Sequence, residues 1–252
     1  MNNHKFSIFF ENIELFFNKK NNIFEIKDKN LINRIINVLR LNVCENFIIF
    51  NFKFEYLLNI KKIEKNLIFC EIKDKKLIEK NEKKIFLYLP IIAKEKIEEI
   101  LYICGQQNIN IIFVKYEKSY RKINLKENLE RFNKIIISGC EQGKQYEIPK
   151  IFEKEIEFFE MIKQINENEQ YFFYCDFDWK KLIDFNFSKF IKNDFYFTSG
   201  PEAGFSKKEK ELLNSFNCFK LSDYTLRSVD TINFISILLR SLWILIIPLE
   251  NS

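Results

Sequence analysis

The chain has 252 residues, enough for one large domain or two modest ones, and 47% of them are hydrophobic, which supplies ample material for a core. Its net charge of +5 is a mild basic excess that fits a polyanionic partner without requiring one. The six cysteines are scattered and His4 is the single histidine, so we expect no metal site and reduced, mostly buried thiols, as in a cytoplasmic protein.

The first third of the chain is typical of β structure. Apolar runs separated by polar turns predict three strands of a meander, at 46–50, 54–60 and 66–72. One helix is expected before them, because apolar residues recur at helical spacing over 31–39, and Asp28 or Asn30 could cap it. The lysine-rich stretch 73–84 is expected to be a linker.

From residue 85 the pattern changes to alternating strands and helices. The expected strands are 85–89, 109–114, 171–175, 195–199 and 219–221. The expected helices are 94–106, 125–139, 153–165, 206–215 and 229–246. Such alternation predicts an α/β fold with a parallel sheet covered on both faces. We therefore expect two domains, 1–78 and 83–252.

No segment predicts membrane insertion. The first apolar stretch of the chain contains charges, which a signal peptide would not have there. The last apolar run, 232–247, is interrupted by Asn233, Ser236 and Arg240 and is shorter than the roughly 20 residues that a bilayer span needs. We expect it to form a buried helix.

The most informative segment runs from Thr198 to Glu209. Two of the five glycines and one of the four prolines stand in the five positions from Gly200 to Gly204. An apolar run before them predicts the end of a strand, and Ser206 with Glu209 forms a capping box that predicts the start of a helix. Loops of this kind lie at the carboxyl edge of a sheet, where α/β proteins bind cofactors. An ordinary strand-to-helix turn would use the same glycines.

Four segments, in this order along the chain, resemble one protein family. They are Asn37–Leu41 with Phe47–Phe50, Cys140–Gly143 with Ile148-Pro149, Gly200–Ser206, and Leu221–Thr231. Together they resemble the RsmE-type methyltransferases of the SPOUT superfamily, which act on uridine N3 in bacterial small-subunit ribosomal RNA. The resemblance extends over nearly the whole chain. It departs from the family pattern at Ala203, at Ser222-Asp223-Tyr224 and at Ser228-Val229-Asp230.

The resemblance implies both a fold and an activity. It implies a PUA-like β-barrel at 1–78 that helps to hold RNA, followed at 83–252 by an α/β domain with a deep trefoil knot. It implies S-adenosylmethionine as cofactor, bound in the knot, and a homodimer. The implied reaction is methylation of N3 of a uridine in 16S ribosomal RNA, within the small ribosomal subunit.

Main-chain groups of three loops are expected to hold the cofactor at the carboxyl edge of the sheet. The loops are 174–176, 198–204 and 219–226. The expected cofactor-binding residues are Tyr174, Ser199, Gly200, Pro201, Gly204, Leu221, Ser222 and Leu226.

Uridine N3 is a good nucleophile only after it has lost its proton. Arg227 could stabilise the negative charge that develops on the uracil oxygens, and Asp230 or Glu202 could accept the proton. An ion pair between Arg227 and Asp230 at the start of a helix is the alternative interpretation.

Phosphate contacts of the RNA are expected from basic side chains outside the cofactor loops. The expected RNA-binding residues are Arg34, Arg40, Arg121 and Lys122, with Lys118 as a further candidate. Two other hypotheses fit the sequence: a non-catalytic RNA-binding or ribosome-assembly protein on the same fold, and a SPOUT methyltransferase that acts on another RNA.

Overall fold

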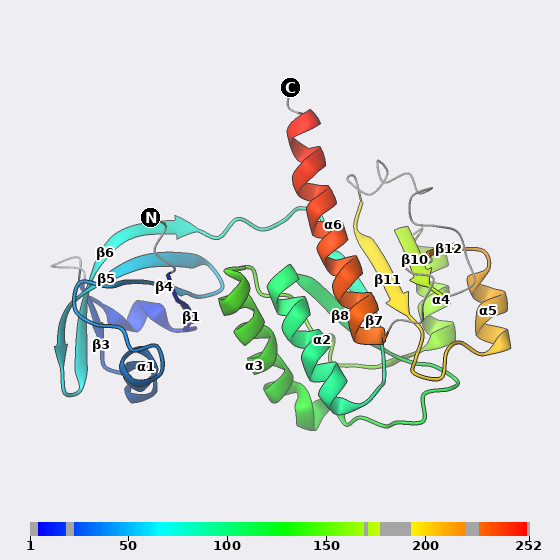
Figure 1. Ribbon diagram of the computed structural model, residues 1–252, viewed down its shortest axis with the longest axis horizontal. Coiled ribbons are helices and arrows are strands. Elements are labelled where there is room, and N and C mark those ends of the chain that lie inside the picture. The colour runs from blue at the N-terminus through cyan, green and yellow to red at the C-terminus, as the bar shows by residue number, and fades with distance from the viewer. Residues whose placement is uncertain (1–4, 19–22, 169–170, 177–192, 220–226, 251–252) are drawn as a thin grey trace. The chain divides into compact units, whose positions relative to one another are not determined.

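The computed structural model describes residues 5–18, 23–168, 171–176, 193–219 and 227–250, the last nine of these by their backbone alone. The chain divides into two compact units (Figure 1). The first comprises Met1–Lys80 and Cys140–Glu147, and the second comprises Asn81–Gly139 and Ile148–Ser252. This division differs from the expected domains 1–78 and 83–252 in the segment Cys140–Glu147, which packs with the first unit.

The first unit is built on a six-stranded sheet with the order β1-β4-β5-β6-β3-β2. Its strands are β1 (Ser7–Phe9), β2 (Phe17–Asn18), β3 (Ile23–Ile26), β4 (Asn46–Phe50), β5 (Phe54–Glu64) and β6 (Leu67–Leu77). β1 pairs with β4 in parallel, and the other neighbours pair antiparallel. Alternate apolar side chains, such as Phe47, Ile49, Leu58 and Ile60, point into one core.

The three strands expected in the meander are confirmed, but two of them are longer than expected. β6 continues through Lys73–Leu77, which the sequence analysis assigned to a linker. The wrong assignment followed from the lysines, which are exposed and give no apolar pattern. Pairing with β5, from Leu57↔Asp74 to Phe54↔Leu77, satisfies the backbone of this segment instead.

A helix between β3 and β4 is confirmed, in two parts. α1 (Lys29–Asn33) continues into a π-helical turn, Arg34–Val38. The carboxylate of Asp28 accepts a hydrogen bond of 2.8 Å from the Leu31 N–H, so Asp28 rather than Asn30 is the cap. A 3₁₀ turn, Ile13–Phe16, connects β1 to β2.

Glu141 is a buried carboxylate in the first unit, although it lies far along the chain. It accepts a hydrogen bond of 2.7 Å from the Phe9 N–H and two from the Arg34 guanidinium. Ser7 Oγ donates to the Glu141 carbonyl at 2.8 Å. These bonds satisfy a charge that burial would otherwise penalise, and they tie Cys140–Glu147 to β1 and to the helix after α1.

The second unit contains a parallel sheet of six strands with the order β12-β10-β11-β7-β8-β9, which confirms the predicted α/β class. Its strands are β7 (Ile85–Pro90), β8 (Ile109–Lys115), β9 (Ile156–Glu157), β10 (Tyr171–Cys175), β11 (Phe195–Ser199) and β12 (Asn217–Phe219). Its helices are α2 (Lys94–Gln107), α3 (Leu125–Gly143), α4 (Phe158–Glu167), α5 (Lys207–Leu213) and α6 (Ser228–Glu250), and the end of α3 from Cys140 on belongs to the first unit.

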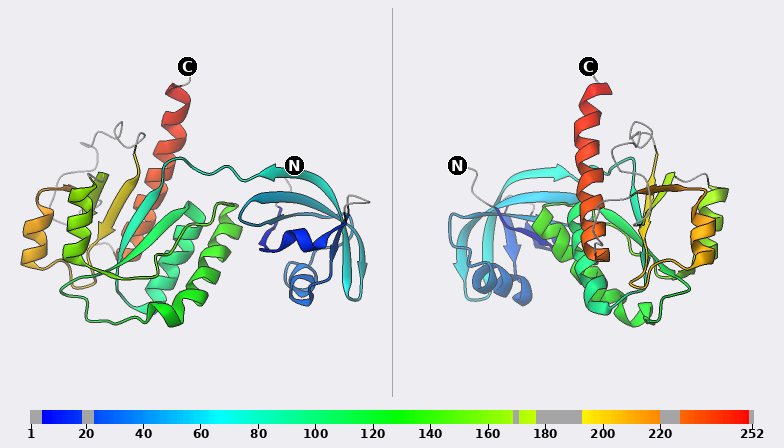
Figure 2. Two further views of the ribbon diagram at one scale, coloured as in Figure 1. Left: turned by 180° about the vertical axis from the view of Figure 1, so that it is seen from behind. Right: turned by 45° about the vertical axis from the view of Figure 1, so that its right-hand side comes forward.

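Helices cover both faces of this sheet. α2 and α6 pack against each other on one face, and α4 and α5 lie on the other (Figures 1 and 2). Because side chains alternate along each strand, Tyr88 and Phe172 join the cluster under α4 and α5. The register brings every strand of the sheet to the same carboxyl edge.

α6 is only partly buried over its described side chains, 228–241. Ile232, Ile235 and Leu239 are buried, as expected, but Phe234 and Ile237 are 48% and 49% exposed. No helix in the described parts of the chain has the length and apolar character needed to cross a membrane.

Gly139 allows α3 to cross α2 closely. A Cβ at this position would overlap the Tyr102 carbonyl oxygen and come within 3.1 Å of the Gly105 Cα. Gly139→Ala should therefore destabilise the protein by about 2 kcal/mol, because backbone overlap outweighs the roughly 1 kcal/mol by which alanine favours a helix. Urea denaturation measures the change.

Ser138→Ala is the matched control, since Ser138 is the exposed neighbour on the same helix. Its free energy of unfolding should stay within about 0.5 kcal/mol of the wild-type value. A Gly139→Ala protein as stable as the control would contradict the close crossing of α3 and α2.

Candidate active site

The candidate site lies where the order of the strands reverses. β7 has β8, the next strand in sequence, on one side and β11 on the other. β8 and β9 form one half of the sheet, and β11, β10 and β12 form the other half. The loops that leave β11, β7 and β8 therefore start side by side at the carboxyl edge. Crevices at such a reversal are where open α/β sheets bind ligands.

A chain of buried hydrogen bonds holds these three strand ends together. Thr198 Oγ1, on β11, donates to the Tyr88 carbonyl on β7 at 2.7 Å. The hydroxyl of Tyr116, just after β8, lies 2.7 Å from the same Thr198 oxygen. Burial raises the pKa of Tyr116, so its phenol stays neutral and can donate.

Glu209 fixes the loops that follow. Its carboxylate, which is 2% exposed, accepts hydrogen bonds of 2.7 Å from the Glu117 N–H and from the Ser206 N–H. Ser206 Oγ accepts from the Glu209 N–H in return, so the predicted capping box is confirmed. One acidic side chain thus joins the loop after β8 to the start of α5.

The glycine loop between β11 and α5 is a tight turn. The Gly204 N–H donates to the Pro201 carbonyl at 2.8 Å, and Gly204 has a φ of 69°, which glycine adopts without strain. A Cβ on Gly200 would lie 3.3 Å from the Phe205 ring. The Phe205 ring therefore packs against Gly200, whereas no described side chain covers the main chain at Gly204.

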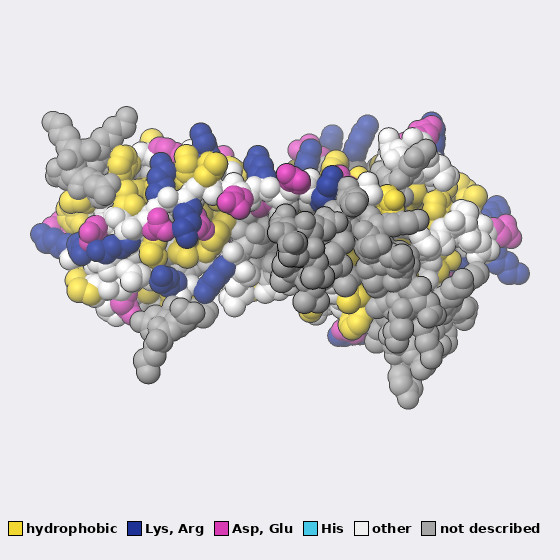
Figure 3. All heavy atoms as spheres, turned by 90° about the horizontal axis from the view of Figure 1, so that it is seen from above, with side chains coloured by type: hydrophobic (Ala, Val, Ile, Leu, Met, Phe, Trp, Pro, Cys, Tyr) yellow, Lys and Arg dark blue, Asp and Glu magenta, His cyan; other side chains and the backbone are white. Residues whose placement is uncertain are grey.

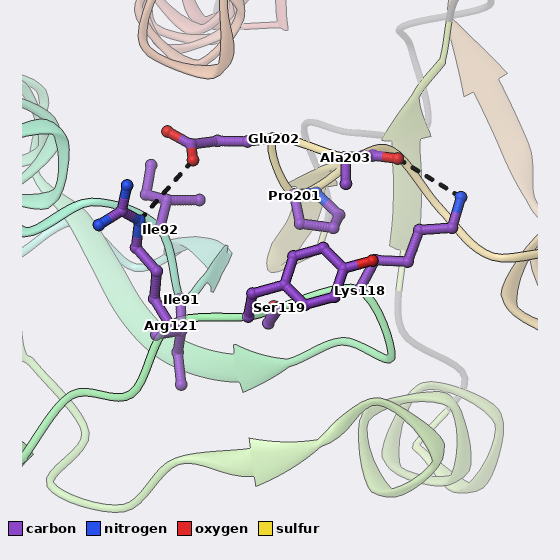
Figure 4. A pocket seen from close by; sticks show the side chains of 9 residues that line it. Ile91, Ile92, Lys118, Ser119, Arg121, Pro201, Glu202 and Ala203 are labelled. Atoms are coloured by element: carbon purple, nitrogen blue, oxygen red, sulfur yellow. Dashed lines mark hydrogen bonds and ion pairs between the residues drawn. The ribbon is translucent and has the colours of Figure 1, made fainter.

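A cavity of about 350 Å³ opens beside this loop (Figure 4). The residues that line it follow β7, β8 and β11: Ile91, Ile92, Lys118, Ser119, Tyr120, Arg121, Pro201, Glu202 and Ala203. Lys96 Nζ donates to Glu202 Oε1 at 2.6 Å, and Arg121 Nε lies 3.9 Å from Glu202 Oε2. Lys118 Nζ donates to the Phe205 carbonyl at 3.0 Å and to that of Ala203 at 3.4 Å.

The expected cofactor residues within the described chain all lie at the carboxyl ends of β10 and β11. They are Tyr174, Ser199, Gly200, Pro201 and Gly204. Tyr174 and Ser199 are 1% and 4% exposed, and the Tyr174 ring packs edge-on against Phe205, 5.8 Å away. The other three, Leu221, Ser222 and Leu226, lie outside the described residues.

Ser199 carries an unusual buried hydroxyl. Its Oγ has no hydrogen-bond partner among the described residues. Next to it, the Gly200 carbonyl accepts a long contact of 3.5 Å from Ser228 Oγ at the start of α6. A buried hydroxyl at the sheet edge needs a partner, and a bound ligand can supply one.

Arg227 and Asp230 form an ion pair at the start of α6. Arg227 Nε and Nη2 each donate to an Asp230 carboxylate oxygen at 2.8 Å, so the pair is bidentate. Hydrogen bonds from Arg227 lower the pKa of Asp230 and so weaken it as a base. The structure thus brings Arg227 and Asp230, two of the three expected catalytic residues, into direct contact. The third, Glu202, lies in the glycine loop.

The expected RNA-binding residues fall in both units. In the first, Arg34 is held by Glu141, and Arg40 is exposed. In the second, Arg121 lines the cavity, and Lys122 is exposed beside it.

Six residues at the cavity or its edge were not expected as site residues from the sequence: Ile91, Ile92, Lys96, Ser119, Tyr120 and Ala203. Tyr120 carried a usable signal, because it is an aromatic residue in a run of charged and polar residues directly after a strand. In the part of the chain that the structure describes, no group of three or more His, Cys, Asp or Glu could hold a metal ion.

Comparison with known proteins identifies the class of this fold and site. A sequence profile described as the RNA methyltransferase domain matches residues 79–237. The chain is 32% identical over 186 residues to ribosomal RNA small subunit methyltransferase E 1 of Borreliella burgdorferi, covering 66% of this chain and 74% of the relative. It is 26% identical over 200 residues to methyltransferase E of Rickettsia conorii, covering 78% and 80%.

Solved structures share the fold over almost the whole chain. Methyltransferase E of Neisseria gonorrhoeae, crystallised with S-adenosyl methionine, superposes with a TM-score of 0.75 at 21% identity and covers 95% of this chain and 98% of its own. A putative methyltransferase from Legionella pneumophila, also with the bound cofactor, gives 0.70 at 19% identity, with the same two coverages. The chain therefore belongs to the RNA methyltransferase family, and within it to the RsmE type that its four sequence segments predict.

Removing the Glu209 carboxylate should loosen the loops around the cavity. Glu209→Ala leaves two backbone N–H groups without their charged acceptor, which should cost about 3 kcal/mol of stability. Chemical denaturation measures the free energy of unfolding. The control is Glu211→Ala, because Glu211 is an exposed acidic residue on the same helix. Equal stability of the two variants would show that the Glu209 contacts do not hold the site.

Proposed function

We propose that this protein transfers a methyl group from S-adenosylmethionine to N3 of a uridine in 16S ribosomal RNA. The observation that carries the proposal is the tight glycine turn Gly200–Gly204 at the reversal of the sheet, beside the buried Ser199 hydroxyl, which has no partner among the described residues. Membership of the RsmE-type family and relatives named for small-subunit ribosomal RNA support the choice of substrate.

The residues present fit the cofactor. S-adenosylmethionine offers an adenine edge, ribose hydroxyls and an amino acid end, which pair well with main-chain N–H and C=O groups and with hydroxyls. Ser199, Gly200 and Gly204 supply such groups in the described chain, and Leu221, Ser222 and Leu226 are proposed to complete the site. When bound, the cofactor supplies an electrophilic methyl carbon.

Arg227 is proposed to prepare the acceptor base. A guanidinium beside the uracil oxygens stabilises the anion that uridine becomes when N3 loses its proton, and so lowers the pKa of N3. The bidentate pair with Asp230 limits the orientations that Arg227 can adopt.

Both expected carboxylates are proposed to position cations rather than to accept the proton. Asp230 holds Arg227, and its own pKa is lowered by that contact. Glu202 is paired with Lys96 and Arg121. The N3 proton then leaves to solvent.

The remaining features of the proposal concern the fold and assembly. We propose that the first unit is a PUA-like barrel, that the α/β domain contains a C-terminal trefoil knot, and that the protein is a cytoplasmic homodimer acting on the small ribosomal subunit. Phe234 and Ile237 on α6 are exposed, and this helix extends beyond the ends of the strands in both views of Figure 2. These features support a dimer in which a second copy of the chain packs against α6. Lys and Arg side chains spread over the face shown in Figure 3 support an RNA partner.

The proposed reaction predicts a specific chemical mark. Mass mapping of modified uridines in small-subunit RNA should find 3-methyluridine in cells that have this gene and lose it in cells without it. Adding purified protein and S-adenosylmethionine to the unmodified subunits should restore the mark. An unchanged pattern would contradict the function, and absence of cofactor binding by calorimetry would favour a non-catalytic RNA-binding protein.

Arg227→Ala should shift the pH dependence of the reaction. Without the cation, the pKa of N3 rises, so the methylation rate should fall at least tenfold near neutral pH and recover as the pH is raised. S-adenosylmethionine affinity should stay within about twofold. The control is Arg131→Ala, an exposed arginine in an ion pair with Glu98 on α2. A loss equal at every pH, or an equal loss of cofactor affinity, would contradict this role.

A further inference from the structure

We propose that the cavity beside Tyr120 is a nucleotide subsite for single-stranded RNA. In it, a base stacks on Tyr120 and its phosphate contacts Arg121 and the neighbouring lysines. The RNA partner rests on the proposed function. The subsite shares the glycine loop after β11 with the expected cofactor site, but its other walls follow β7 and β8 rather than β10 and β12.

Tyr120 is presented for stacking by a folded turn. Its side chain is 84% exposed, and no other described ring packs against it. The turn before it is held by two hydrogen bonds: the Ser119 N–H donates to the Tyr116 carbonyl at 2.9 Å, and the Tyr116 N–H donates to Ser119 Oγ at 3.3 Å. Since Tyr116 is anchored in the buried hydroxyl chain, the segment that carries Tyr120 is fixed at its base.

The charge around the cavity favours an anion. Lys96 and Arg121 both lie near the Glu202 carboxylate, which can neutralise only one of them. Lys118 donates to the Ala203 and Phe205 carbonyl oxygens, which leave its charge intact. A phosphate beside Arg121 or beside Lys118 would therefore be attracted.

The floor and size of the cavity suit a base. Ile91, Ile92 and Pro201 line the cavity with apolar atoms (Figure 4). About 350 Å³ lies within the range of small-ligand pockets. An aromatic ring, an apolar floor and several cations together are the usual means of holding single-stranded nucleic acid.

The glycine loop is the wall that this subsite shares with the expected cofactor site. Pro201, Glu202 and Ala203 line the cavity, while Gly200, which precedes them on the same loop, contacts Ser228 at the start of α6. A nucleotide held here lies next to the loop proposed to bind S-adenosylmethionine.

Binding of a fluorescein-labelled decauridylate, followed by fluorescence anisotropy with the whole protein, tests the subsite. Tyr120→Ala should raise the Kd about tenfold, and Tyr120→Phe, which keeps the ring, should stay within about twofold. The matched control is Phe159→Ala, which removes an exposed aromatic side chain from α4. Because Tyr120 is exposed, its removal should leave the melting temperature unchanged.

The cations are tested by the salt dependence of the same binding. Arg121→Ala should weaken binding and reduce the slope of log Kd against log salt by about 0.7, the value for one phosphate contact on a single strand. Lys134→Ala, an exposed lysine on α3 paired with Glu130, should change neither quantity.

Calorimetry with S-adenosylmethionine separates this inference from the proposed function. If the protein does not bind the cofactor but Tyr120→Ala still weakens decauridylate binding, the subsite stands and the methylation proposal fails. If Tyr120→Ala binds decauridylate as tightly as Phe159→Ala does, the subsite is wrong, whether or not methylation occurs. Failure of the wild-type protein to bind the oligonucleotide also overturns it.

Discussion

The site depends on the buried hydrogen bonds that join the Tyr116 hydroxyl to the Thr198 hydroxyl, and the Thr198 hydroxyl to the Tyr88 carbonyl. These bonds connect the ends of three strands that are far apart in sequence, at the point where their order in the sheet reverses. All three residues are buried, so loss of one partner would leave a polar group unsatisfied at a cost of about 1–3 kcal/mol. Because the strand ends are fixed, the three loops that leave them start from defined positions.

Under the two proposals, one sheet edge binds two ligands. The glycine loop after β11 offers main-chain groups and the Ser199 hydroxyl, which suit a cofactor. Its Pro201–Ala203 segment, with the loops after β7 and β8, forms a cavity with cations and an exposed aromatic ring, which suit a nucleotide. Glu209 connects the loop after β8 to the end of the glycine loop, because its carboxylate accepts hydrogen bonds from the Glu117 and Ser206 N–H groups. Transfer of a methyl group between two bound partners depends on such positioning.

The sequence was most informative where the signal is local. The strand 195–199, the glycine loop and the Ser206–Glu209 capping box are confirmed, because glycine, proline and capping residues act on their immediate neighbours. The parallel sheet followed from the alternation of strands and helices. The lysine-rich end of β6 was missed, because only pairing with β5 makes it a strand.

Contacts between distant segments could not be predicted from local pattern. Glu141 is bound by Arg34, 107 positions away, and nothing near either residue indicates the other. The cavity brings together Ile91, Tyr120 and Pro201 only because β7 lies between β8 and β11. Arg227 and Asp230 were expected as catalytic residues or as an ion pair, and their bidentate contact is now defined.

Amide hydrogen exchange with and without S-adenosylmethionine is the most direct test of the central claim, that the main chain of the glycine loop holds the cofactor. The account predicts slower exchange in peptides that span residues 198–206 when the cofactor is added, with no change in the β5–β6 hairpin. Cofactor binding that leaves exchange in 198–206 unaltered would contradict the account.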